Sequence, residues 1–154
     1  AMLAFYEKFL YRDLSSLDVD AAVAAWPQWP AVEANIRSTF DGALADHAVA
    51  ETRVKYVEPG ELRARLTRVI DGWEDTRTAL TKQLVPARDF ADQLRRAGAP
   101  SRPEDIGLTA ADVQATFPKA MYYRSRYTAL DLAREAGWYD ELVNEVFSPD
   151  GLWT

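Results

Sequence analysis

Apolar side chains recur at helical spacing along most of the chain. The longest stripe follows the spacing i, i+4, i+8 and i+11 and consists of Leu62, Leu66, Ile70 and Trp73. This spacing places all four side chains on one side of a helix. Runs of alternating β-branched residues, which are typical of strands, are missing. The pattern therefore predicts an all-α fold.

Proline, glycine and capping residues divide the helical pattern into segments. Gly72 lies inside the longest stripe and is expected to soften that helix without ending it. The segments Thr109–Asp112 and Thr128–Asp131 predict two helix starts, because a threonine followed by an acidic residue three positions later satisfies free backbone amides. We expect about eight helices in one compact domain that covers residues 1–154.

The charge balance and the missing residue types exclude several classes of function. Acidic residues outnumber basic ones by 24 to 18, which gives a net charge of −6. A nucleic-acid partner is not expected, because it requires a concentrated positive surface. The chain has no cysteine, which excludes disulfides and thiolate metal sites. Its single histidine excludes a metal site of several histidines within one chain.

The apolar runs are too short for a membrane protein. None approaches the roughly 20 residues that a helix needs to span a bilayer. The first residues also lack the basic segment, apolar stretch and cleavage site of a signal peptide. We therefore expect a cytoplasmic protein without a membrane partner.

Two groups of residues have both a chemical and a structural interpretation. Asp46 could orient His47 as a general base, but an ordinary helix position is the favoured interpretation of this histidine. The three tryptophans Trp26, Trp29 and Trp73 would either line a ligand pocket or anchor the core, and the core is favoured.

Other polar residues carry no sharper prediction. The chain has no HExxH, GxSxG or GxGxxG motif and no phosphate-binding GxxxxGK[ST] loop. Its many carboxylates show no spacing specific to a metal. The helix face that carries Arg63, Arg65 and Arg68 is interpreted as solvated surface.

The most informative cluster is basic and lies directly before the predicted helix from Ala129. Two guanidinium groups beside the free amides of a helix start form a candidate anion or substrate site. Its residues are Arg124, Arg126, Tyr127 and Thr128.

A structural interpretation of the same cluster is favoured. In it, Thr128 caps the helix and Asp131 already supplies the negative charge at its start, so that an external phosphate would compete with both. Tyr127 then packs against the last helices, and Arg126 binds backbone carbonyls.

Six segments of the chain form a recognisable pattern. The segments with the most specific motifs are Ala97–Pro100, Pro103–Thr109 and Arg124–Ala133. Those nearer the start of the chain are Leu17–Val19, Ala24–Pro27 and Glu51–Tyr56. In the same order, these segments resemble the C-terminal part of the sn-glycerol-1-phosphate dehydrogenase family, and the resemblance spans nearly the whole chain.

The resemblance implies a fold and a reaction. The family belongs to the dehydroquinate synthase-like and iron-containing alcohol dehydrogenase superfamily, in which an α/β half binds NAD(P) and a second half is all-helical. A divalent metal, usually zinc, is held in the cleft between them by one aspartate and two histidines. The implied reaction is reversible hydride transfer between dihydroxyacetone phosphate and sn-glycerol 1-phosphate.

The chain departs from this pattern in its missing half. It has no glycine-rich turn and no strands for a nucleotide, and His47 matches neither metal-binding histidine of the family. No catalytic, cofactor or metal residue is therefore carried over, and the chain alone is expected to bind neither NAD(P) nor zinc.

Three hypotheses follow from these observations. The first is the helical half of a glycerol-1-phosphate dehydrogenase-like enzyme, inactive alone and paired with a missing nucleotide-binding half. The second is a stand-alone helical interaction or oligomerisation module that self-associates through the surface left exposed. The third is a small-anion binder that uses Arg124 and Arg126.

Overall fold

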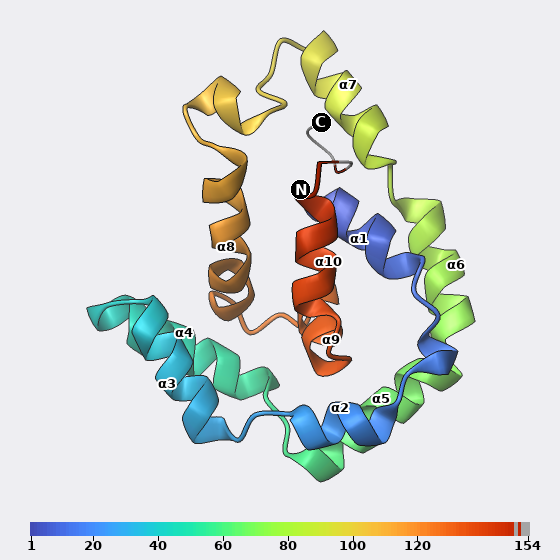
Figure 1. Cartoon of the computed structure of the whole chain (residues 1–154), viewed down its shortest axis with the longest axis vertical. Helices are drawn as coiled ribbons and strands as arrows, with labels where there is room; N and C mark the ends of the chain where they lie inside the picture. Colours follow the sequence, from blue (N-terminus) through green and yellow to red (C-terminus); the bar gives the residue numbers. More distant parts are fainter. Residues whose placement is uncertain (150, 152–154) are drawn as a thin grey trace.

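The computed structural model describes residues 1–149 and residue 151, which form helices joined by short loops (Figure 1). No strand occurs among these residues, so the predicted all-α class is confirmed. Within the same part of the chain, no helix is both long and apolar enough to cross a membrane.

The described residues form ten α-helices and two short 3-10 helices. The first five α-helices are α1 (Met2–Leu10), α2 (Val19–Ala25), α3 (Trp29–Thr39), α4 (Gly42–Lys55) and α5 (Pro59–Asp71). The other five are α6 (Trp73–Gln83), α7 (Ala87–Arg96), α8 (Ala110–Tyr122), α9 (Ala129–Glu135) and α10 (Tyr139–Val146). The 3-10 helices are η1 (Leu14–Ser16) and η2 (Pro103–Ile106).

Gly72 separates two helices where the sequence predicts one. It ends α5, where its amide donates to the Arg68 carbonyl at 3.2 Å, and begins α6, where its carbonyl accepts from Thr76 at 3.1 Å. The expectation that the helix continues through Gly72 is therefore wrong. Glycine lacks the side chain that favours helical backbone, and this local preference is sufficient to break the helix here.

The two predicted capping sequences form as expected. In each, the threonine hydroxyl accepts a backbone amide of the new helix, while the following aspartate accepts the threonine's own amide. At α8 these bonds join Thr109 and Asp112, at 3.1 and 2.8 Å. At α9 the Thr128 amide donates to Asp131 at 2.8 Å. The cap fixes where α9 starts.

The centre of the fold is α9 with α10. Figure 1 shows both helices in the middle of the molecule, with α1 to α6 curving around them and α8 alongside. Six of the seven residues of α9 are buried, including its two acids Asp131 and Glu135. A helix buried on all sides must pair any charge that it carries, since an isolated buried charge is very costly.

The core itself is one continuous cluster of aromatic and aliphatic side chains. Phe5 and Phe9 of α1 are 0% and 1% exposed and contact α10 and Trp73 respectively. Trp73 is 4% exposed, so its core interpretation is confirmed. Trp26 and Trp29 are partly buried and pack against the same cluster, while Trp26 also lines open space.

A matched pair of glycines tests the turn between α9 and α10. Gly137 has φ +75°, a conformation that is strained for any side chain, whereas Gly60 lies in the first turn of α5 with open space around its Cβ position. We expect Gly137→Ala to cost about 1 kcal/mol of unfolding free energy. Gly60→Ala should gain about 0.5 kcal/mol. Urea unfolding followed by circular dichroism measures both changes in free energy. Equal effects would contradict the claim that Gly137, unlike Gly60, occupies a backbone conformation that is strained for other residues.

Candidate functional site

One face of α4 holds the loop that contains the predicted anion site. His47, Glu51 and Lys55 are spaced four residues apart and therefore lie on the same side of the helix. The His47 Nε2 atom is 3.2 Å from the Tyr123 carbonyl oxygen, and the Glu51 carboxylate accepts the Ser125 amide at 2.6 Å. Three successive turns of α4 thus fix the segment between α8 and α9.

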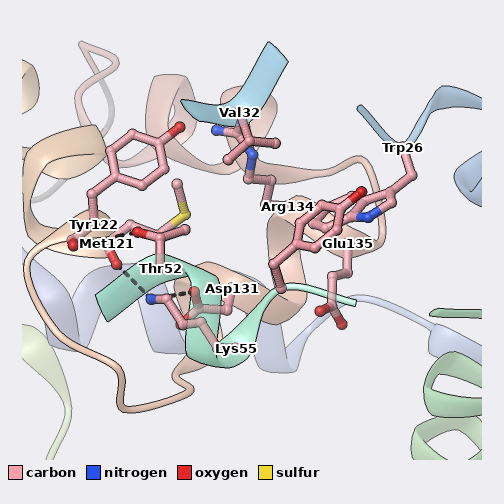
Figure 2. Close-up of a pocket in the computed structure, with 10 residues that line it drawn as sticks. Trp26, Val32, Thr52, Lys55, Met121, Tyr122, Asp131, Arg134 and Glu135 are labelled. Carbon is pink, nitrogen blue, oxygen red and sulfur yellow. Dashed lines mark hydrogen bonds and ion pairs between the residues drawn. The ribbon is translucent and has the colours of Figure 1, made fainter. Parts of the chain in front are cut away.

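The third of these contacts is a buried ion pair. The Lys55 ammonium lies 2.6 Å from the Asp131 carboxylate and donates to the Met121 carbonyl at 2.5 Å (Figure 2). The side chains of Lys55 and Asp131 are only 7% and 9% exposed. Because Asp131 also caps α9 through Thr128, one carboxylate joins α4, the end of α8 and the start of α9.

A second buried acid on α9 is paired from two directions. Glu135 is 3% exposed, and its two oxygens contact the Arg65 guanidinium at 2.5 Å and the Tyr127 hydroxyl at 2.6 Å. Arg65 also lies over the Tyr127 ring, 5.0 Å from its centre. The positive charges of Lys55 and Arg65 therefore balance the two acids of α9.

The surroundings of this network shift two pKa values. Burial raises the pKa of Glu135, while its contacts with Tyr127 and Arg65 oppose the shift. Burial and then the negative charge of Glu135 raise the pKa of the Tyr127 phenol far above its ordinary value near 10. Folding therefore favours the protonated phenol, which donates its hydrogen bond to Glu135.

The space enclosed by this network is small. A cavity of about 30 Å³ lies between α3, α4, α8 and α9, and Lys55, Asp131 and Glu135 are among its lining residues. This volume has room for about one water molecule and none for an organic substrate. The network consequently stabilises the fold and does not itself enclose a substrate site.

The structure divides the four predicted anion-site residues into two pairs. The Tyr127 hydroxyl is bound by Glu135, although the residue as a whole is 38% exposed, and the Thr128 side chain is part of the α9 cap. The side chains of Arg124 and Arg126 are exposed, and neither has a hydrogen bond or an ion pair within the described part of the chain.

Anchored and free residues alternate along the loop: Tyr123 and Ser125 are held through backbone atoms and Tyr127 through its hydroxyl. Residues 123, 125 and 127 bind α4 or α9, and the two arginines between them face solvent. The amides of Ser125 and Thr128 already bind the carboxylates of Glu51 and Asp131. Anion binding here therefore remains a prediction that rests on the two guanidinium groups, since the amides are occupied.

The favoured interpretation of His47 as an ordinary helix position agrees with the structure. Asp46 does not orient it, because the Asp46 carboxylate binds Arg37 at 2.8 Å and the histidine faces the Tyr123 carbonyl. One further interpretation from the sequence needs correction. Arg65 is not solvated surface, since its side chain is 23% exposed and pairs with Glu135.

Sequence reasoning missed Lys55 and Glu135 as members of a network. The signal was present in α9: residues 129–135 are apolar apart from Asp131, Arg134 and Glu135, and such a helix is buried on most sides. Two acids spaced i, i+4 on it require basic partners. Nothing in the sequence, however, identifies which of the 18 basic residues they are.

The comparisons with known proteins add no relative. No family model matches the chain, and no curated protein and no solved structure is similar to it at a significant level. The argument for function therefore depends on the residues and their geometry.

The buried pair Lys55–Asp131 predicts a large stability effect. Lys55→Met leaves Asp131 buried without its cation, and we expect a loss of about 3–5 kcal/mol in the free energy of unfolding. The control is Arg63→Met, which breaks an ion pair to Asp20 whose side chains are 50% and 83% exposed. That change should cost less than about 1 kcal/mol. Thermal and urea unfolding compare the two, and similar losses would show that burial does not strengthen the pair.

The raised pKa of Tyr127 predicts a loss of stability in alkali. Above pH 10 the unfolded phenol loses its proton while the folded one keeps it, so the folded state binds more protons and its stability falls as pH rises. Tyr127→Phe should lose part of this pH dependence, because phenylalanine does not titrate. Urea unfolding between pH 8 and 11 measures it, with Tyr11→Phe as a control at an 88% exposed site. If the unfolding free energy of Tyr127→Phe falls with pH as steeply as that of the wild type, the raised pKa of Tyr127 is contradicted.

Proposed function

We propose that this chain is the helical half of an oxidoreductase related to the sn-glycerol-1-phosphate dehydrogenases, and that it is inactive alone. In this proposal a second, nucleotide-binding half supplies NAD(P) and a divalent metal such as zinc. The completed cleft interconverts dihydroxyacetone phosphate and sn-glycerol 1-phosphate by hydride transfer.

The observation that carries the proposal is the convergence of segments that resemble the family. Ala24–Pro27, Glu51–Tyr56 and Arg124–Ala133 are separated by up to about a hundred residues in the sequence. Residues from all three line the same small cavity, and two of the segments are joined by the Lys55–Asp131 pair. The resemblance thus falls on residues that form one structural unit, which supports a shared architecture rather than chance similarity.

The residues of this chain do not fit the metal and the nucleotide that the resemblance implies. Among the described residues, no group of three or more histidine, cysteine, aspartate or glutamate side chains is placed to hold a metal ion. His47 contacts the Tyr123 carbonyl and its ring instead. The same residues contain no strand and hence no strand-to-helix turn of the kind that binds a dinucleotide. We assign both groups to the other half.

The contribution of this half would be to bind the substrate's phosphate. Arg124 and Arg126 are free guanidinium groups on a loop that is anchored on each side of them. Guanidinium groups suit phosphate oxygens because each offers several donors in a fixed plane. The anchoring limits the conformational freedom that the loop would lose when it binds an anion.

The surface beside the loop would receive the other half. Val54 of α4 is 75% exposed and Tyr123 is 47% exposed, although both are large and apolar. His47 lies on the same face of α4 as Val54 and contacts Tyr123, so these side chains adjoin the two arginines. Self-association through this face is the alternative arrangement, in which the chain acts as an interaction module.

The two arginines give the decisive prediction. In the chain combined with its nucleotide-binding half, either as one longer polypeptide or as two, Arg124→Ala with Arg126→Ala should raise KM for dihydroxyacetone phosphate tenfold or more. KM for unphosphorylated dihydroxyacetone should stay constant, because it has no phosphate to bind. NAD(P)H oxidation followed at 340 nm measures both.

The control is Arg68→Ala, which removes another exposed arginine that has no ion pair in the described part of the chain. It should change neither KM. Turnover by the isolated chain would refute its inactivity, and an equal effect of the double variant on both substrates would refute phosphate binding by the loop. Sedimentation of the isolated chain tests the alternative, because a strictly monomeric chain over a wide concentration range excludes self-association.

A further inference from the structure

A second, larger opening adjoins the small cavity, and Trp26 and Arg134 line both of them. It is a cleft of about 300 Å³ between the end of α2 and the turn that joins α9 to α10. Its walls include Ala25, Trp26, Pro27, Arg134, Tyr139 and Asp140. The volume is at the lower end of the range for small-molecule sites. Arg124 and Arg126 do not line it, so it is independent of the phosphate loop and of the proposed function.

Arg134 is the unusual residue of this cleft. Four basic residues in the described part of the chain are at least half-buried, and three of them, Arg12, Lys55 and Arg65, pair with carboxylates. The Arg134 guanidinium has no ion pair or hydrogen bond among the described residues and lies over the Tyr122 ring, 5.7 Å from its centre. A half-buried guanidinium without an anion has given up hydration without full compensation.

A second polar group of the wall also lacks a partner. Tyr139 is 7% exposed, and its buried hydroxyl has no hydrogen bond within the part of the chain that the structure describes. Burial raises the pKa of this phenol, and the positive charge of Arg134 opposes the shift. The wall of this cleft therefore includes a cation and a hydroxyl that both lack an acceptor, whereas nearly all buried polar groups in proteins have a partner.

The remaining walls define the rest of the ligand. Trp26 is held rigidly, because its indole nitrogen donates to the Val57 carbonyl at 2.9 Å and its ring stacks on Tyr56 at 5.8 Å. With Pro27 and Ala25 it forms an apolar surface suited to a flat hydrocarbon group. Asp140 is exposed at the rim and would repel a second negative charge.

We propose that this cleft binds a small organic monocarboxylate, whose carboxylate pairs with Arg134 and whose apolar body lies against Trp26. One cation matches one carboxylate, and a guanidinium binds its two oxygens through parallel hydrogen bonds. Inorganic phosphate fits less well, because it carries more charge near Asp140 and has no apolar part.

Benzoate is the probe for this site. Titration of the ¹⁵N-labelled chain, followed by NMR, should give saturable shifts that concentrate at residues 22–27 and 134–140. Arg134→Gln should raise the dissociation constant for benzoate tenfold or more, since it removes the charge-assisted hydrogen bonds. Arg68→Gln is the matched control and should bind benzoate like the wild type. Inorganic phosphate at equal concentration should leave residues 22–27 unshifted.

A second variant protects the test against loss of the fold, because Arg134 also stacks on Tyr122. Ala25 is exposed and ends α2, so Ala25→Leu should keep the helix. The leucine side chain should fill the cleft and weaken benzoate binding as strongly as Arg134→Gln does. Circular dichroism confirms the helical content of each variant. The proposal is overturned if the wild type shows no saturable shifts, if they fall elsewhere, or if a folded Arg134→Gln or Ala25→Leu variant binds benzoate unchanged.

Discussion

The Lys55–Asp131 ion pair is the interaction on which the arrangement of this protein most depends. Asp131 caps its own helix, binds the lysine of α4, and through that lysine is tied to the Met121 carbonyl near the end of α8. Removing water from both charges is costly, and the hydrogen bonds to Thr128 and Met121 offset that cost. One carboxylate thus sets the position of three helices relative to each other, and with them the loop that carries the two free arginines.

The burial of α9 explains why such a pair is needed. This short helix lies among its neighbours with six of seven residues buried, so its acids are out of reach of solvent. Each acid is neutralised by a base from a different helix, Lys55 from α4 and Arg65 from α5. A hydrophobic helix would be stabilised by contacts that tolerate sliding, whereas directed bonds at two points fix the rotation and height of α9.

The sequence was sufficient to predict the features that depend on neighbours along the chain. The all-α class, the threonine–aspartate caps at Thr109 and Thr128, and the burial of Trp73 follow from spacing and capping chemistry. The Gly72 break was misjudged, since propensity and the apolar stripe disagreed there. Pairs such as Arg65–Glu135 join residues 70 positions apart, and no local rule assigns a given arginine to a given acid.

The alternation of the loop at residues 123–127 has a consequence for how the protein can change during evolution. Odd-numbered residues are bonded to the fold and even-numbered ones are not, so the charge of the even positions can be altered without penalty to folding. The length of the loop, in contrast, is fixed. A single inserted residue would move the Ser125 amide away from Glu51 or the Tyr127 hydroxyl away from Glu135, and so break one of the bonds that hold the loop. Selection can therefore retune what this loop attracts by substitution, but not by insertion or deletion.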